Sequence, residues 1–139
     1  MPETEEFLSE WLKTGKQGVV VTADASGLVL AQDDPELAEI YRSAALATPD
    51  SIGVVWALRR EGETGISRVS GVDLVESLCE LSAKDGYGIY LLGSEPGVAE
   101  KAAERLRLKH PGCRIVGARH GFFPEEDNEL IAEEIAPVK

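Results

Sequence analysis

The segment GYGIYLLGSEPGVAEKAAERLRLKHPGCRIVGARHG, residues 86–121, decides the fold. An apolar run at 89–92 stops at the glycine-rich turn 93–97, and apolar residues then recur at about helical spacing over 98–106. A second apolar run follows at 114–117. Strand, turn, helix and strand make a βαβ unit, whose strands pair in parallel through a right-handed crossover.

Four residues stand where apolar segments stop, and we expect them at the carboxyl ends of parallel strands. They are Thr22, Asp50, Gly93 and Gly117. Ligands of such sheets bind in the crevice beyond those strand ends, so the four should share one ligand-binding rim.

The composition indicates one globular α/β domain over residues 1–139, large enough to bury roughly 68% of its unfolded surface. The hydrophobic content of 43% and the charged content of 28% are ordinary for such domains. A net charge of −11 disfavours a nucleic-acid polymer or an anionic membrane as a partner. The acidic run 125–134 is typical of a solvated face.

No apolar run approaches the roughly 18 residues of a membrane-spanning helix, and we expect neither a signal peptide nor a membrane span. Cys79 and Cys113 lack metal-ligand spacing and lie in apolar patterns, which predicts two reduced core cysteines in a cytoplasmic protein.

Outside the central unit the pattern is mostly helical. Leu28-Val29-Leu30 within 25–32 fits either a strand or a buried helix. Asp34 should cap a helix that begins at Pro35. The remaining predicted elements are a helix at 3–14, a strand at 19–22, a connection at 46–49 and helices at 52–60, 72–84 and 125–136.

The turn Gly93–Gly97 is the best candidate for an anion contact, because it opens a helix whose N-terminal amides and dipole favour phosphate. The alternative is a tight turn with Ser94 as the helix N-cap. The stretch lacks GxGxxG, which disfavours a nicotinamide cofactor, and GxxxxGK[ST] is absent from the chain.

Asp50 is a candidate general base, and its alternative role is the N-cap of the helix near Ile52. Arg68 could clamp a diphosphate or form a surface ion pair. Asp73 could be catalytic, or could stabilise the dipole of the helix whose first turn holds it. The two histidines form no cluster, and no DxD pair offers carboxylates to a metal-bound nucleotide.

Several motifs occur in an order that matches one family. They are Thr22, Ala44-Ala45-Leu46, Pro49-Asp50-Ser51-Ile52-Gly53-Val54-Val55, Arg68-Val69-Ser70-Gly71-Val72-Asp73-Leu74, Tyr90-Leu91-Leu92-Gly93-Ser94-Glu95-Pro96-Gly97-Val98-Ala99, Pro111-Gly112, Ile115-Val116-Gly117 and Gly121-Phe122-Phe123. From about Val19 to its end the chain resembles the WecG/TagA/CpsF glycosyltransferases, family 26, which make bacterial cell-surface polysaccharides.

The resemblance implies a Rossmann-like parallel sheet flanked by helices, with residues 25–32 helical. It also implies transfer, with inversion, of an N-acetylmannosamine-type sugar from UDP to a lipid-diphosphate-linked N-acetylglucosamine. Neither a metal nor another cofactor is expected. Teichoic acid linkage-unit synthesis is one pathway of this kind, at the inner face of the membrane.

The resemblance also assigns roles to residues. Asp50 matches the family's proposed general base, and Thr22 and Arg68 match its substrate-site threonine and arginine, with Arg68 facing phosphate. The expected substrate-binding residues are Asp24, Asp73, Gly93, Ser94, Gly97, Gly117, Gly121 and Phe122.

The sequence departs from the family at three places. Asp24 stands where Asn is usual, Ser51 stands where Gly is usual, and the family continues beyond Lys139. We therefore expect an apparently truncated chain that folds, forms homo-oligomers and has little activity alone. The alternatives are a non-catalytic nucleotide-sugar-binding or oligomerisation module and a different Rossmann-like nucleotide enzyme.

Overall fold

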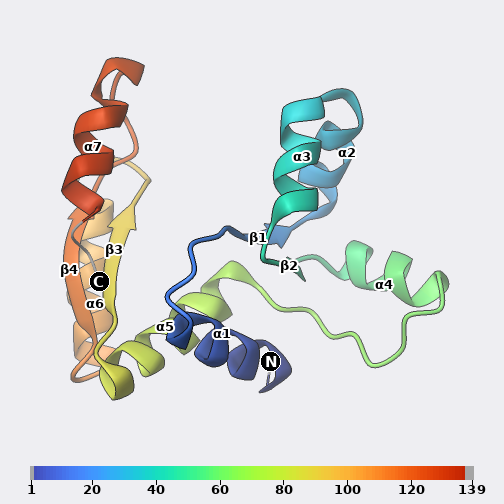
Figure 1. Cartoon of the computed structure of the whole chain (residues 1–139), viewed down its shortest axis with the longest axis horizontal. Coiled ribbons are helices and arrows are strands. Elements are labelled where there is room, and N and C mark those ends of the chain that lie inside the picture. The colour runs from blue at the N-terminus through green and yellow to red at the C-terminus, as the bar shows by residue number, and fades with distance from the viewer. Residues whose placement is uncertain (1, 137–139) are drawn as a thin grey trace. The chain divides into compact units, whose positions relative to one another are not determined.

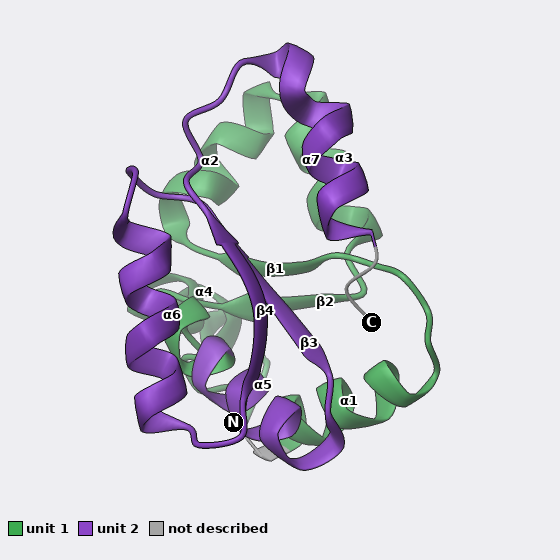
Figure 2. Cartoon of the chain, turned by 90° about the vertical axis from the view of Figure 1, so that its left-hand side faces the viewer, with its two compact units in different colours: residues 1–74 green, residues 75–139 purple. Residues whose placement is uncertain are grey.

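The computed structural model describes residues 2–136, which form a mixed α/β structure with parallel strands (Figure 1). The chain divides into two compact units, residues 1–74 and residues 75–139 (Figure 2). Each unit contains one parallel pair of strands. The predicted α/β class and the parallel pairing are therefore confirmed.

Unit 1 is built around the pair β1–β2. Thr22 on β1 lies opposite Thr48 on β2, α2 packs against α3, and α4 contacts β2. Its elements are α1 (Pro2–Lys13), β1 (Val20–Ala23), α2 (Ala25–Asp33), α3 (Pro35–Ser43), β2 (Leu46–Pro49) and α4 (Ile52–Arg60).

The predicted helix starts in unit 1 agree with the structure, except for one cap. Asp34 accepts hydrogen bonds from the backbone N–H groups of Glu36 and Leu37, both at 3.0 Å, and Pro35 opens α3. Helix α4 has the predicted bounds, but its N-cap is Ser51, whose hydroxyl accepts from Val54 N at 3.3 Å. The alternative role of Asp50 as the N-cap is therefore wrong, because its carboxylate faces other donors.

Two ambiguous segments of unit 1 are settled by pairing and packing. Residues 25–32 are helical, as the resemblance implies. Residues 46–49, which the pattern predicts as a connection, form strand β2. Hydrogen bonds from Ala45 N to Val19 O at 2.8 Å and from Asp50 N to Ala23 O at 2.9 Å continue the pairing with β1 beyond both ends of β2.

Helix α5 (Gly71–Asp85) begins in unit 1 and continues into unit 2. The parallel pair β3–β4, connected by α6, confirms the βαβ unit. The other elements of unit 2 are β3 (Gly88–Leu92), α6 (Val98–Lys109), β4 (Arg114–Arg119), the 3₁₀ turn η1 (Glu125–Asp127) and α7 (Asn128–Ile135).

The core of unit 2 joins α5, α6 and β4. Its buried members are Cys79, Ala103, Cys113 and Ile115. Both cysteines are free, as predicted, and Cys79 has no exposed surface. Burial, together with a hydrogen bond to Cys113, raises the pKa of the Cys79 thiol to about 12.

Gly117 does not end a strand, so its predicted position at the sheet rim is wrong. Strand β4 continues to Arg119, and Gly117 pairs with Tyr90 beside a bulge whose extra residue is Val116. A Cβ atom at Gly117 would lie 2.5 Å from Tyr90 Cδ2. The glycine therefore leaves space for the Tyr90 ring.

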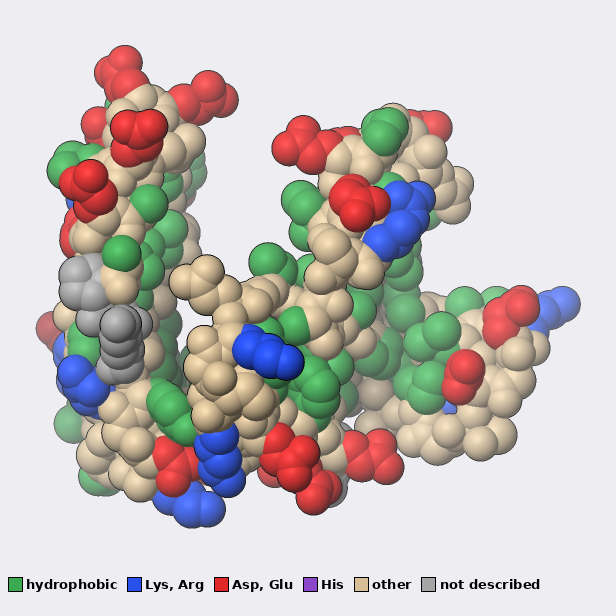
Figure 3. Space-filling view, in the orientation of Figure 1, with side chains coloured by type: hydrophobic (Ala, Val, Ile, Leu, Met, Phe, Trp, Pro, Cys, Tyr) green, Lys and Arg blue, Asp and Glu red, His purple; other side chains and the backbone are tan. Residues whose placement is uncertain are grey.

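The acidic run 125–134 forms η1 and α7, and most of its carboxylates are exposed (Figure 3, upper left). Glu134 is more than a solvated charge. It accepts hydrogen bonds from Tyr90 Oη at 2.5 Å and from Arg119 Nη1 at 2.8 Å, which fasten α7 to the sheet. Both hydrogen bonds lower the pKa of Glu134. Burial, followed by the hydrogen bond to Glu134, raises the pKa of Tyr90.

Of the helices described between residues 2 and 136, none combines the length and the apolar content of a membrane span.

Glu76 gives unit 2 a pH-dependent link between α5 and the end of α6. Its carboxylate pairs with Lys109 Nζ at 2.5 Å and with His110 Nε2. The hydrogen bond from Lys109, followed by the one from His110, lowers the pKa of Glu76. A lowered carboxyl pKa stabilises the folded state above the unfolded pKa of about 4.3, and this stabilisation is lost as the pH falls through the folded pKa.

We expect Glu76→Gln to lower the free energy of unfolding at pH 7, with a difference from the wild type that becomes smaller in acid. Urea unfolding of the wild type and the variant at pH 7 and at pH 3 measures this difference in the free energy of unfolding. Glu80→Gln, an exposed carboxylate on the same helix, is the control and should have little effect. A Glu76→Gln difference that stays the same at both pH values would contradict this role.

Candidate functional site

In unit 1, the structure brings together three of the predicted site residues with the start of α5. We call Thr22, Asp50, Arg68 and Gly71 the Asp50 cluster. Gly71 lies between two of them: a Cβ atom built on it would be 3.7 Å from Thr22 Oγ1 and 3.9 Å from Asp50 Oδ2. Thr22 lies at the carboxyl half of β1, and Asp50 directly follows β2. Parallel pairing thus places both at the same end of the strand pair, as the sequence predicts.

Both oxygens of the Asp50 carboxylate have a fixed partner. Oδ1 accepts from Arg68 Nη2 at 3.1 Å, and Oδ2 accepts from the backbone N–H of Gly71 at 3.2 Å. Arg68 Nε also donates to the Asp50 carbonyl at 2.6 Å. Because a carboxylate oxygen can accept more than one hydrogen bond, each oxygen can still receive a proton donor from a substrate.

Arg68 is paired but accessible. Half of its side-chain surface is exposed, compared with a quarter for Asp50. A guanidinium carries five N–H donors in a planar fork, so Arg68 can hold Asp50 and a phosphate group at the same time. The arrangement accommodates both predicted alternatives, the ion pair and the diphosphate clamp.

The segment that carries Arg68 is held beside β2 and leads into α5. Val69 N donates to Pro49 O at 2.9 Å. Ser70 and Asp73 then form a capping box: Asp73 N donates to Ser70 Oγ at 3.2 Å, and Ser70 N donates to Asp73 Oδ2 at 3.3 Å. The Ser70 hydroxyl also donates to Asp73 Oδ2, at 2.6 Å. The bond from the Ser70 hydroxyl is the main cause of the lowered pKa of Asp73. In the structure Asp73 therefore stabilises the start of α5, which was its alternative role.

Asp24 also has a structural role in unit 1. It follows β1 and caps α2, with Oδ1 accepting from Gly27 N at 2.8 Å. Its side chain is exposed, and its part in substrate binding stays a prediction.

In unit 2, the turn Gly93–Gly97 joins β3 to α6 through left-handed backbone. Gly93, Ser94 and Gly97 have φ angles of +142°, +64° and +84°. Gly97 is the N-cap of α6, and no side chain caps the helix. The alternative that Ser94 is the N-cap is therefore wrong, because the turn continues for three more residues before the helix begins.

The segment after β4 closes against this turn. Gly93 N donates to Arg119 O, and Gly121 N donates to Ser94 O, both at 2.9 Å. A Cβ atom at Gly121 would lie 3.1 Å from Gly93 Cα, so a side chain there would be tightly packed against the backbone of the turn. Phe122, the next residue, is 69% exposed.

The predicted residues therefore fall into two groups, one in each unit. Unit 1 holds Thr22, Asp24, Asp50, Arg68 and Asp73, and unit 2 holds Gly93, Ser94, Gly97, Gly117, Gly121 and Phe122. Among residues 2–136, no three His, Cys, Asp or Glu side chains are placed to hold a metal ion.

Sequence reasoning missed Gly71 as a donor to Asp50. The two residues are 21 positions apart, so no local pattern connects them. The available signal was Ser70-Gly71 at a helix start, where the first backbone N–H groups have no partner within the helix.

The model of the Glycosyl transferase WecG/TagA/CpsF family matches residues 1–139.

Proposed function

The chain belongs to the WecG/TagA/CpsF glycosyltransferase family, and from this we propose that it transfers an N-acetylmannosamine-type sugar from UDP to a lipid-diphosphate-linked N-acetylglucosamine. The observation that carries the proposal is the Asp50 cluster. It places a carboxylate, a threonine hydroxyl and an accessible guanidinium together at adjacent strand ends. The proposed setting is the cytoplasmic face of the membrane, with the chain acting as a homo-oligomer.

In the proposed reaction Asp50 is the general base. Its carboxylate accepts the proton of the acceptor hydroxyl, while that oxygen attacks the anomeric carbon of the donor sugar. The bond from the anomeric carbon to the phosphate oxygen breaks, and UDP leaves with the bonding electrons. Attack opposite the leaving group inverts the anomeric centre.

The other residues of the Asp50 cluster orient the Asp50 carboxylate and offer hydrogen bonds to the substrates. Gly71 N–H and Arg68 fix the direction of the Asp50 carboxylate, since each donates to one of its oxygens. The free donors of Arg68 are suited to a diphosphate oxygen. Thr22 Oγ1, beside Gly71, is available to hydrogen-bond a substrate hydroxyl.

We assign the diphosphate of UDP to the turn in unit 2. The first turn of α6 has no side-chain cap, and the dipole of this twelve-residue helix favours an anion at its N-terminus. Glycines at 93 and 97 leave the backbone of the turn accessible, because a Cβ atom at either would meet open space.

A substitution of Gly97 tests this assignment. We expect Gly97→Val to weaken UDP binding by more than tenfold, about 1.4 kcal/mol, because a branched side chain at φ +84° distorts the turn and covers its amides. Isothermal titration with UDP measures the affinity.

The matched control is Gly86→Val, also in unit 2. Gly86 has φ +82° and open space around its Cα, so it imposes the same backbone strain away from the turn. UDP affinity should be unchanged in this variant. Equal UDP affinity in folded Gly97→Val and in the wild type would remove the turn from the donor site.

A second candidate is a nucleotide-sugar-binding or oligomerisation module without turnover. The observation in its favour is that both Asp50 oxygens already have protein partners, which is also what a purely structural ion pair requires. Titration with UDP and a transfer assay with a short-chain lipid-diphosphate acceptor separate the two candidates. Binding without transfer supports the module, and transfer supports the enzyme.

A further inference from the structure

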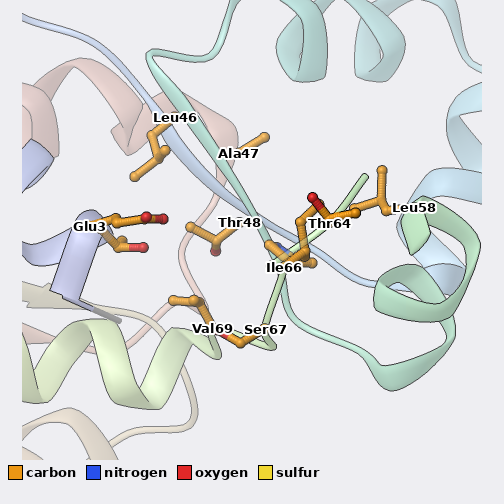
Figure 4. Close-up of a pocket in the computed structure, with 12 residues that line it drawn as sticks. Glu3, Leu46, Ala47, Thr48, Leu58, Thr64, Ile66, Ser67 and Val69 are labelled. Atoms are coloured by element: carbon orange, nitrogen blue, oxygen red, sulfur yellow. The ribbon is translucent and has the colours of Figure 1, made fainter. Parts of the chain in front are cut away.

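Two features of the chain lie outside the proposed site. One is a cavity of about 300 Å³ in unit 1, lined by the first turn of α1, strand β2 and the segment 64–69 (Figure 4). Its polar wall groups are hydroxyls and the carboxylate of Glu3, which water can satisfy, so the cavity identifies no ligand. The other feature is the pair of cysteines in unit 2.

The only two cysteines of the sequence lie together in the core of unit 2. Cys79 on α5 and Cys113, just before β4, both belong to the buried cluster that joins α5, α6 and β4. Both thiols are free. Neither residue has a part in the proposed sugar transfer.

Contacts on both sides of Cys113 fix its position against α5. The backbone N–H that follows Cys113 donates to Ser82 Oγ at 2.8 Å. A Cβ atom on the preceding residue, Gly112, would lie 3.7 Å from Ala83 Cβ. Ser82 and Ala83 follow Cys79 by about one helical turn, so the three residues share one face of α5. Cys113 therefore lies against the face of α5 that carries Cys79.

The two thiols face each other inside this contact. A hydrogen bond joins them, and both side chains are buried in the same cluster. A disulfide holds its two sulfurs about 2 Å apart, and only cysteines whose side chains already point toward each other can form one without moving the backbone. Cys79 and Cys113 meet this condition.

We propose that Cys79 and Cys113 are a redox-sensitive pair, which two-electron oxidation converts into a disulfide that locks α5 against the start of β4. The oxidant is a small-molecule disulfide, with glutathione disulfide as the probe. In a reducing medium the two thiols stay free and the core opens and closes without a covalent link. The inference is independent of the proposed function.

The oxidation takes two thiol–disulfide exchange steps. Cys113 keeps 9% of its surface exposed and reacts first. Its sulfur loses a proton and attacks glutathione disulfide, whose S–S bond breaks, and one glutathione leaves as a thiol with that proton. The Cys79 sulfur then loses its proton and attacks the Cys113 sulfur, and the second glutathione leaves as a thiol. Two protein thiols are oxidised, and one glutathione disulfide is reduced to two thiols.

The packing of the core favours the internal disulfide over a lasting mixed disulfide. Ala103 and Ile115 complete the buried cluster around the two cysteines, and protein interiors are close-packed. A glutathione group on Cys113 would hold this core open. The internal bond adds no atom to the core and removes two hydrogens, so the core can close again around it.

The disulfide also encloses a long segment of unit 2. Strand β3 and helix α6 both lie between Cys79 and Cys113 in the sequence. Cross-linking the ends of such a segment restricts the unfolded chain and stabilises the folded one. We expect the equilibrium constant for unfolding to fall by roughly tenfold or more on oxidation.

The test equilibrates the 139-residue chain with mixtures of reduced and oxidised glutathione, in buffer and in denaturing urea, and counts the disulfide by mass spectrometry. We expect the equilibrium constant for the internal disulfide to be roughly tenfold or more higher in the folded chain, because a bond that stabilises the fold is favoured by the fold to the same extent. An equal or lower constant in the folded chain would overturn the proposal, as would a mixed disulfide as its only product.

Urea unfolding of the reduced and oxidised chains gives a second measurement. The oxidised wild type should unfold at a higher urea concentration than the reduced wild type. Cys79→Ser and Cys113→Ser are the matched controls: each keeps one thiol, cannot close the bond, and should gain no stability from the oxidant. Equal unfolding of the two wild-type forms, or a gain in either variant, would contradict the proposal.

Discussion

Replacing Asp50 with Asn is expected to reduce the rate of sugar transfer by about 10²–10⁴-fold, the usual contribution of a general base. Asn has nearly the same shape and keeps one oxygen for Gly71 N–H, but it cannot take a proton from the acceptor hydroxyl. UDP binding should remain close to the wild-type value. A transfer assay on both proteins, with UDP titrations, measures the two quantities.

The matched control is Asp34→Asn, also in unit 1. Asp34 caps α3, and Asn is as good an N-cap as Asp, so the rate and the stability should both be retained. A wild-type rate in the Asp50→Asn enzyme would leave Asp50 with only a structural role, as an anchor for Arg68 and Gly71.

The second large effect is expected at Gly117. Gly117→Val should destabilise unit 2 by about 1–3 kcal/mol, the typical cost of forcing a side chain into filled space. The space is filled by the Tyr90 ring, which a Cβ atom at position 117 would overlap. Urea unfolding gives the difference in the free energy of unfolding.

A double-mutant cycle identifies the cause. In a Tyr90→Ala background the ring is gone, so Gly117→Val should cost little or even stabilise, because valine favours strands and glycine weakens them. Equal costs in the two backgrounds would show that the glycine is needed for its backbone rather than for the ring.

Local chemistry was enough to predict much of this fold from the sequence. Asp34-Pro35 predicts the start of α3, and the apolar pattern of 52–60 predicts the bounds of α4, although the cap of that helix is Ser51 and not Asp50. The βαβ unit was predictable because two apolar runs enclosed a helical pattern between glycine-rich turns.

The wrong predictions concern residues whose local structure depends on contacts with residues far away in the sequence. Residues 46–49 contain Ala-Thr-Pro, which has little strand character, and they become β2 through pairing with β1. Gly117 looked like a strand end, but its role depends on Tyr90, 27 positions earlier. Ser94 has the residue type of an N-cap, but the turn continues through left-handed backbone to Gly97, which caps the helix that begins at Val98.

The candidate site divides in the same way. Strand ends predicted that Thr22 and Asp50 lie together, because parallel neighbours end on the same side. The hydrogen bonds of Asp50 to Arg68 and Gly71 span 18 and 21 positions, and no periodicity in the sequence indicates such contacts.

Alkylation of the buried Cys79 thiol can measure how often the core of unit 2 opens. The thiolate is the form that reacts with alkylating agents, and a pKa of about 12 leaves almost none of it at neutral pH. Because the residue also has no exposed surface, a reagent must wait until α5 separates from α6 and β4. The rate of alkylation at Cys79 is thus set by how often this core opens. The lifetime of the closed core can therefore be measured on the native chain, without an introduced label.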